Sequence, residues 1–312
     1  MEYILLIVGF VLLIKGADFF VDGASSIAGK LKVPALIIGL TVVSMGTSLP
    51  EAAVSVSASL NGNNDISLGN VIGSNMFNLL MVVGVSSVLM PIIAEKAMLK
   101  RDMPVNIGIT VILFVMLLDG TLSRIDAIIL LVLFAAYMFI LIRSALKNRS
   151  EEESPKIYSW FKSILLSVIG VAAIIGGGQL VVNNAKTIAL NWGMSETLVG
   201  LTIVAIGTSL PELVTSIVAA RKHEPGIAMG NAVGSCIFNV LFILGLTGVI
   251  KPMTADKAFF IDTAILIAVS SLMLLFAFTR KKTGRVEGAV CVLIYVAYTA
   301  YIIMRAYSLW IF

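Results

Sequence analysis

Charged residues are scarce in this chain, because only 13% of its 312 residues are Asp, Glu, Lys or Arg while 59% are hydrophobic. A typical soluble domain carries about 25% charged residues. The composition therefore excludes an ordinary soluble domain and indicates an integral membrane protein.

Histidine and cysteine are also nearly absent, with one and two residues respectively. His223 falls in a basic loop, where we expect a surface role. Cys236 and Cys291 fall in apolar segments, where a thiol usually packs as a small hydrophobic group. The sequence contains no H-E-x-x-H motif, no disulfide or zinc spacing and no Ser/His pair for nucleophilic catalysis. It therefore argues against an enzyme and against a resident metal or organic cofactor.

Long apolar runs fill most of the chain and predict an all-α fold. Ten of them are long enough to cross about 30 Å of hydrocarbon. They cover residues 3–20, 35–60, 66–93, 103–118, 125–142, 161–182, 198–220, 227–250, 258–278 and 286–304. Asp18, Asp22, Asp119, Asp126 and Asp262 lie toward the ends of these runs, and we expect them at the membrane interface.

The basic residues predict the orientation. If the N-terminus lies outside, 16 of the 22 Lys and Arg residues fall on the inside face, as the positive-inside rule requires. The C-terminus then also lies outside, and the basic pI reflects topology and not binding to nucleic acid. Because Met1-Glu2-Tyr3 lacks the basic start of a signal peptide, we expect the first span to be retained in a multi-pass protein of the cell membrane.

The chain contains an internal repeat. The string GLTVVSMGTSLPE at residues 39–51 returns as GLTIVAIGTSLPE at residues 200–212, an offset of 161 residues. Without gaps, 23 of 60 positions are identical between residues 33–92 and 194–253. Five spans per repeat force the second copy to enter the membrane from the opposite face, the arrangement of many secondary transporters. We therefore predict two inverted five-helix repeats, 1–143 and 159–312, joined by a cytoplasmic linker at 144–158.

Each repeat places a proline inside an apolar span. Pro50 and Pro211 cannot donate to the carbonyls of Gly46 and Gly207, so the helix should break there. Broken helices at membrane depth survive where the freed groups line a cavity or find partners. The breaks bring hydroxyls and a carboxylate together at Thr47, Ser48 and Glu51, and again at Thr208, Ser209 and Glu212. A capping box at Ser48-x-x-Glu51 and Ser209-x-x-Glu212 is the structural alternative.

The neighbouring spans add a polar stripe. The stripes are Asn70, Ser74 and Asn78 in the first repeat and Asn231, Ser235 and Asn239 in the second, each with a spacing of four. Gly69-xxx-Gly73 and Gly230-xxx-Gly234 predict close helix packing. Together with the two glutamates, these oxygens suit a hard cation such as Ca²⁺ or Na⁺.

At these residues the sequence resembles the calcium/cation antiporter superfamily, and most closely its prokaryotic sodium/calcium exchangers. The two GTSLPE strings and the two GNxxGSxxxN strings are similar to that superfamily's signature repeats. The resemblance implies broken helices around ion sites between spans two, three, seven and eight. It also implies that spans one and six slide against this core to alternate access.

Matched by motif, the resemblance implies that Glu51 and Glu212 are shared ligands of the transported Ca²⁺ and Na⁺, with Thr47 and Thr208 beside them. The remaining implied ligands are Ser48, Ser209, Ser74, Ser235 and the backbone at Ser44 and Ala205. From their place in the polar stripes we add Asn78 and Asn239 as candidate ligands. The archaeal exchangers carry an acidic residue at the position of Asn239, and potassium-dependent members of the superfamily also favour an acid there. Asn in both repeats therefore argues against potassium dependence and leaves the coupling ion open.

We therefore predict an antiporter that exchanges Na⁺ for Ca²⁺ and functions as a monomer in membrane lipid. Ca²⁺/H⁺ exchange is the alternative within the same class, since a proton needs only the carboxylates. A cation channel could use the same oxygens, but paired inverted repeats favour alternating access over a continuous pore.

Overall fold

The computed structural model describes residues 1–62, 64–147, 157–194, 196–199, 202–203 and 205–306. The described chain is almost entirely helical, as predicted. The elements of the first repeat are α1 (Glu2–Leu31), α2 (Ala35–Ile38), η1 (Gly39–Val43), α3 (Ser44–Thr47), α4 (Leu49–Leu60), α5 (Asn64–Phe77), η2 (Asn78–Val82), α6 (Val83–Leu89), β1 (Ile92–Ile93), η3 (Met98–Asp102), α7 (Met103–Met116), η4 (Leu117–Asp119), β2 (Thr121–Leu122) and α8 (Arg124–Lys147).

The second repeat follows the same order. Its described elements are α9 (Trp160–Asn191), α10 (Glu196–Val199), α11 (Ala205–Gly207), α12 (Leu210–Arg221), α13 (Pro225–Phe238), η6 (Asn239–Leu244), α14 (Gly245–Ile250), β3 (Met253–Thr254), α15 (Lys257–Arg280), β4 (Lys282–Thr283) and α16 (Arg285–Ala306). Because α8 continues to Lys147, the first repeat's last helix runs into the segment predicted as a linker. Residues 148–156 of that segment lie outside the described residues, so the division into two repeats and a linker stays a prediction.

The helices match the predicted membrane spans. Within the described residues, eight single helices are long and apolar enough to cross a membrane, and α2 to α4 form a ninth span bent by 48° at its break. The tenth predicted span, 198–220, includes residues outside the description. The ten-span prediction agrees with these helices.

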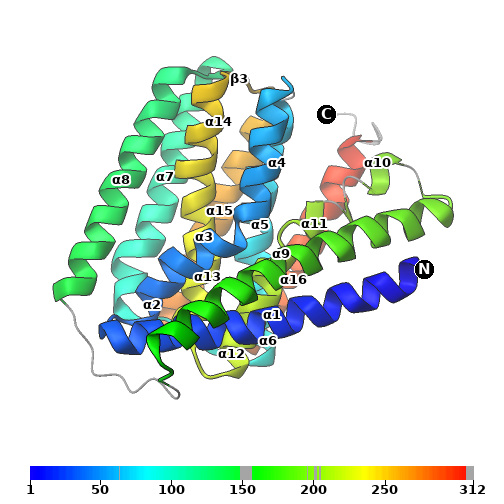
Figure 1. Cartoon of the computed structure of the whole chain (residues 1–312). Helices are drawn as coiled ribbons and strands as arrows, with labels where there is room; N and C mark the ends of the chain where they lie inside the picture. The colour runs from blue at the N-terminus through cyan, green and yellow to red at the C-terminus, as the bar shows by residue number, and fades with distance from the viewer. Residues whose placement is uncertain (63, 148–156, 195, 200–201, 204, 307–312) are drawn as a thin grey trace.

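Two helices are longer than the sequence suggests. We predicted spans at 3–20 and 161–182, but α1 ends at Leu31 and α9 at Asn191. In Figure 1 these two helices lie side by side and cross the steep helices α7, α8 and α14 at a large angle. An inclined helix needs more residues to cross the same thickness.

Two aspartates that we predicted at the membrane interface also contact the rest of the protein. Asp18 and Asp22 lie inside α1, well before its end. The Lys222 ammonium, just after α12, pairs with both carboxylates at 3.4 and 2.7 Å. These charges therefore bind α1 to the core, in addition to any interfacial role.

Glycines bring α1 and α9 into close contact. A Cβ added to Gly9 would lie 2.9 Å from the Gly177 carbonyl oxygen, and one added to Gly16 would lie 2.9 Å from that of Gly170. Both distances are shorter than real Cβ contacts allow. Backbone-to-backbone packing of this kind requires small residues, as between other membrane helices.

The predicted glycine pairs differ between the repeats. A Cβ on Gly230 or Gly234 would lie 2.9 Å or closer to the backbone of residues 36–40, so this pair packs closely as predicted. Gly69 and Gly73 have no such neighbour among the described residues, and the nearest atom to a Cβ on Gly69 is Phe259 Cε1 at 3.6 Å. The counterparts of residues 39 and 40 in the second repeat, residues 200 and 201, lie outside the described residues, so for the first repeat close packing stays a prediction.

Short strands pair between the two repeats in a pseudo-two-fold arrangement. β1 pairs antiparallel with β4, and β2 pairs antiparallel with β3, so each pairing joins one repeat to the other. At the offset of 161, β3 is the counterpart of β1 and β4 of β2. The two pairings are therefore equivalent to each other, as expected for two copies of one unit.

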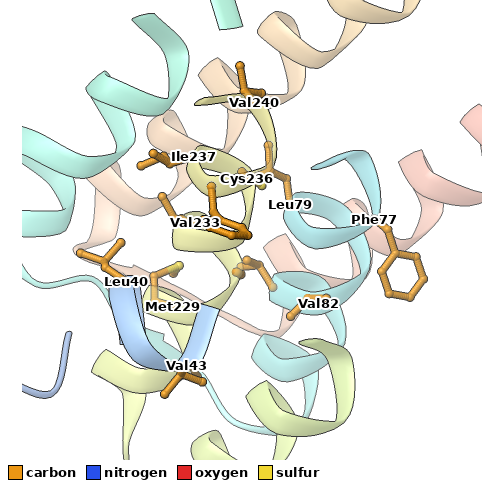
Figure 2. Close-up of a cluster of buried hydrophobic side chains, with 14 of the residues drawn as sticks. Leu40, Val43, Phe77, Leu79, Val82, Met229, Val233, Cys236, Ile237 and Val240 are labelled. Atoms are coloured by element: carbon orange, nitrogen blue, oxygen red, sulfur yellow. The ribbon is translucent and has the colours of Figure 1, made fainter. Parts of the chain in front are cut away.

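The core lies where η1, η2 and α13 meet. Figure 2 shows buried side chains from all three of these elements, with Leu40, Leu79, Val233 and Cys236 among them. Helix α13 is buried along its entire length, unlike the lipid-facing α8, which exposes many of its apolar side chains. Polar groups carried by α13 and the elements around it are consequently shielded from both lipid and water.

Candidate ion-binding site

The predicted helix breaks are present in both repeats. Helix α3 ends at Thr47 and α4 begins at Leu49, with Pro50 in its first turn. In the second repeat α11 ends at Gly207 and α12 begins at Leu210, with Pro211 in its first turn. Proline suits the first turn because its missing N–H would have no partner there. Each break thus starts a new helix inside the protein.

The two glutamates lie directly after these breaks. Glu51 is in the first turn of α4 and Glu212 in the first turn of α12, and both side chains are 0% exposed. The free N–H groups at the start of a helix stabilise negative charge. The fold therefore places two carboxylates at two helix N-termini within the buried core.

Each carboxylate is bound by a serine of the other repeat. Ser48 Oγ donates to Glu212 Oε1 at 2.8 Å, and Ser209 Oγ donates to Glu51 Oε1 at 2.9 Å. Neither serine makes a side-chain capping bond to its own helix. The capping-box alternative is therefore wrong: both hydroxyls reach across the repeat interface instead.

Several buried oxygens at the site have no hydrogen-bond partner among the described residues. They include the second carboxylate oxygens, Glu51 Oε2 and Glu212 Oε2, together with Ser74 Oγ, Thr208 Oγ1 and Asn239 Oδ1. Buried polar atoms are nearly always hydrogen-bonded, since leaving one unpaired costs about 1–3 kcal/mol. Unpaired oxygens in such number are the donor set that a hard cation requires.

The asparagines at the start of each polar stripe have a different role. Asn70 Nδ2 donates to the Glu51 carbonyl at 3.1 Å and to Ser55 Oγ at 2.9 Å. Asn231 Nδ2 donates to the Glu212 carbonyl at 3.2 Å in the same way. Each amide fastens the polar stripe of α5 or α13 to the broken helix beside it.

The second repeat extends this arrangement through Ser216 and across to the first repeat. Asn231 Nδ2 also donates to Ser216 Oγ at 2.9 Å, and Asn231 Oδ1 accepts from Thr47 Oγ1 at 2.9 Å. Sequence reasoning missed Ser55 and Ser216, although they occupy equivalent positions at the 161-residue offset. That identity was a signal that could have found them.

The remaining predicted residues fall as follows. Ser235 Oγ donates to the Ser44 carbonyl at 3.4 Å, which joins α13 to α3 of the other repeat. Ala205 begins α11, the short helix before the second break. Asn78 begins the π-helical turn η2, and its two amide atoms are buried without a partner among the described residues.

Wide π-helical turns surround the site. Gly39–Val43 precedes the first break, and Asn78–Val82 and Asn239–Leu244 continue α5 and α13. Such turns are rare and occur often at functional sites. The sequence analysis gave no signal for them, because a single π turn shifts the hydrophobic stripe of a helix by only about one residue.

Comparison with known proteins identifies the family. The family model described as "Sodium/calcium exchanger protein" matches residues 1–143 and 162–304. The chain belongs to the sodium/calcium exchanger family. It is 35% identical over 339 residues to the sodium/calcium exchanger MaX1 of Methanosarcina acetivorans, covering 95% of this chain and 97% of that protein. It is 38% identical over 308 residues to the putative antiporter CaxA of Alkalimonas amylolytica, covering 95% and 96% of the two chains.

A solved structure agrees with the fold. The sodium-calcium exchanger NCX_Mj, soaked with zero Na⁺ and Ca²⁺, superposes with a TM-score of 0.84 at 35% identity, covering 96% of this chain and 98% of that chain. The chain is thus a multi-pass membrane transporter of the cation/Ca²⁺ antiporter class with the ten-helix inverted-repeat fold. The names of these relatives include both a sodium/calcium exchanger and an antiporter without a stated ion.

Proposed function

We propose that this protein exchanges Na⁺ for Ca²⁺ by alternating access, with both ions held between the two helix breaks. The observation that carries the proposal is the reciprocal serine–glutamate pair. In each carboxylate one oxygen is bound to the opposite repeat, and the other is buried without a partner among the described residues. Two carboxylates provide a charge of −2, which one Ca²⁺ or two Na⁺ ions neutralise.

The neutral oxygens favour Na⁺ over H⁺ as the coupling ion. A proton needs only a carboxylate, whereas Na⁺ needs several oxygen ligands. Ser74 Oγ, Thr208 Oγ1 and Asn239 Oδ1 supply such oxygens, all buried and without a described partner. In this proposal Glu51, Glu212, Thr47 and Thr208 hold Ca²⁺. Ser48, Ser209, Ser74, Ser235, Asn78, Asn239 and the backbone at Ser44 and Ala205 complete the cation sites.

Alternating access requires one body to move against another. The α1–α9 pair is a candidate for the moving body, because its two helices contact each other through glycine backbone and lie across the rest of the molecule (Figure 1). The core around η1, η2 and α13 carries the ion-site oxygens. We propose that the pair slides as a unit while the core stays fixed, in a monomer of the cell membrane with both termini outside.

Uptake of ⁴⁵Ca²⁺ into proteoliposomes tests the coupling ion. Vesicles loaded with Na⁺ and diluted into Na⁺-free medium should take up Ca²⁺, and vesicles with equal Na⁺ on both sides should not. If three Na⁺ leave for each Ca²⁺ that enters, one net positive charge leaves the vesicle. An inside-positive potential should then accelerate Ca²⁺ uptake and an inside-negative one should retard it, since each net charge moved is worth about 2.3 kcal/mol per 100 mV. Full-rate uptake driven by a pH gradient without Na⁺ would replace the proposal with Ca²⁺/H⁺ exchange.

A further inference from the structure

Two residues at equivalent positions of the repeats lie against each other. Asn75 and Cys236 are separated by the repeat offset of 161, and both are buried, with 1% and 0% exposure. Asn75 Nδ2 donates to the Cys236 carbonyl at 3.1 Å, and Cys236 Sγ lies 3.7 Å from the Asn75 carbonyl. Since each residue is the other's counterpart, the pseudo-two-fold axis passes between them. Most ion-site residues are identical in the two repeats, but at this axis an amide in one repeat faces a thiol in the other.

This contact fixes the orientation of a second amide. A backbone carbonyl can only accept a hydrogen bond, so Asn75 must present its Nδ2 to Cys236 and its Oδ1 elsewhere. Asn239 Nδ2 donates to that Oδ1 at 3.1 Å. The Asn239 amide is therefore committed with its nitrogen toward Asn75, and its Oδ1 remains buried without a partner among the described residues.

The free oxygen belongs to the stripe that faces the ion site. Asn239 follows Ser235 by four residues, so their side chains lie on one face of the same helix. Ser235 Oγ contacts the Ser44 carbonyl beside the first helix break. An amide that presented its NH₂ group along this face would repel a cation, whereas the oxygen attracts it.

Within the described part of the chain, the first repeat has no equivalent of the hydrogen bond that orients Asn239. Asn78 corresponds to Asn239, but the residue that corresponds to Asn75 is Cys236, whose thiol is only a weak donor and acceptor. Both amide atoms of Asn78 are buried without a partner among the described residues. Among the described residues, no hydrogen bond fixes which of its two amide atoms faces the site.

We propose that Asn75 is a positioning residue of the ion site, which holds Asn239 with its amide oxygen directed at the transported cation. Asn78 has no such hydrogen bond among the described residues, so the two repeats differ in how their amides are held. This inference rests on the proposed function, because it takes the face shared by Ser235 and Asn239 as part of a cation site. Asn75 itself touches no ion and acts through Asn239.

A double-mutant cycle tests whether Asn75 acts through Asn239. Asn75→Ala, Asn239→Ala and the double variant are reconstituted, and the half-saturating Ca²⁺ concentration and the maximal rate are measured for each. Asn75→Ala should raise the half-saturating concentration roughly threefold to tenfold, the value of one lost hydrogen bond, with little change in maximal rate. In the Asn239→Ala background the same substitution should change it less than about twofold, because the residue through which it acts is gone.

Cys236→Ala is the matched control, since it alters the same buried contact but keeps the carbonyl that orients Asn75. It should leave the half-saturating Ca²⁺ concentration unchanged. Should Asn75→Ala fold poorly, the near-isosteric Asn75→Leu replaces it. The rise in unfolding temperature that Ca²⁺ causes in each purified variant then measures Ca²⁺ binding independently of transport.

The outcomes separate this inference from the function on which it rests. Additive effects of Asn75→Ala and Asn239→Ala, or an equal effect of Cys236→Ala, would show that Asn75 only packs the core, and would overturn the positioning role alone. Wild-type protein that moves no Ca²⁺ would overturn the proposed function, and the positioning role with it.

Discussion

Ser48 and Ser209 each donate a hydrogen bond to the glutamate of the opposite repeat, Glu212 and Glu51, at 2.8 and 2.9 Å. Both residues of each pair are 0% exposed. The contact between the repeats therefore takes part in orienting both carboxylates. Any movement that separates the repeats must also release these oxygens, so ion binding and the relative position of the repeats are linked.

We expect Glu51→Gln and Glu212→Gln each to abolish Ca²⁺ transport while leaving folded protein in the membrane. Loss of one carboxylate leaves a charge of −1 against a divalent cation in a buried site, where neutral oxygens do not compensate. The amide of glutamine can still accept the serine hydrogen bond, so the fold should survive. The measurement is ⁴⁵Ca²⁺ uptake together with size-exclusion chromatography, and near-normal uptake by either variant would refute the assigned site.

Ser48→Ala and Ser209→Ala should weaken ion binding to a similar extent, because the two bonds are equivalent under the repeat. Each substitution removes one hydrogen bond to a carboxylate, worth about 1.5–3 kcal/mol, and one proposed Na⁺ ligand. The half-saturating Na⁺ concentration should rise at least severalfold in both variants.

Ser59→Ala is the control for the serine variants. Ser59 lies on the same helix α4, is 1% exposed and donates to the Thr247 carbonyl at 3.0 Å, in a bond between neutral groups. It should lower stability slightly without changing the Na⁺ dependence. Equal shifts in Na⁺ dependence for all three variants would mean that the serines act through packing.

Gly170→Ala should destabilise the protein and impair transport. A Cβ at this position would lie 2.6 Å from the Phe20 backbone nitrogen, so α1 and α9 would have to separate. Overpacking of this kind typically costs about 1–3 kcal/mol. Gly176→Ala is the control on the same helix, since no described atom lies within 4 Å of its added Cβ. Thermal unfolding of the purified variants gives the comparison, and equal unfolding temperatures would contradict close packing of α1 on α9.

Cysteine labelling should confirm the predicted orientation. In a background lacking Cys236 and Cys291, single cysteines at Arg149 and Lys282 should react with an impermeant thiol reagent only from the cytoplasmic side. A cysteine at Lys186 should react only from outside, because the positive-inside rule places it there. External labelling at position 149 would invert the topology.

The sequence by itself determined the membrane class, the repeat and the two helix breaks. Local chemistry accounts for each of these: scarce charge excludes a water-exposed surface, an odd number of spans inverts the second copy, and Pro50 and Pro211 lack the N–H that a continuous helix requires. The positions of Glu51 and Glu212 in the first turns after the breaks follow from the same prolines.

Only the tertiary structure decided what the polar groups contact. The spacing Ser48-x-x-Glu51 fits a local capping box, yet Ser48 binds Glu212, a residue 164 positions away. The packing of α5 against α13 and η6 likewise places Asn75 against Asn239, through a contact at the axis between the repeats. A repeated motif specifies which groups are available, but a hydrogen bond between distant segments depends on how the two copies pack, and no periodicity within either copy encodes that arrangement.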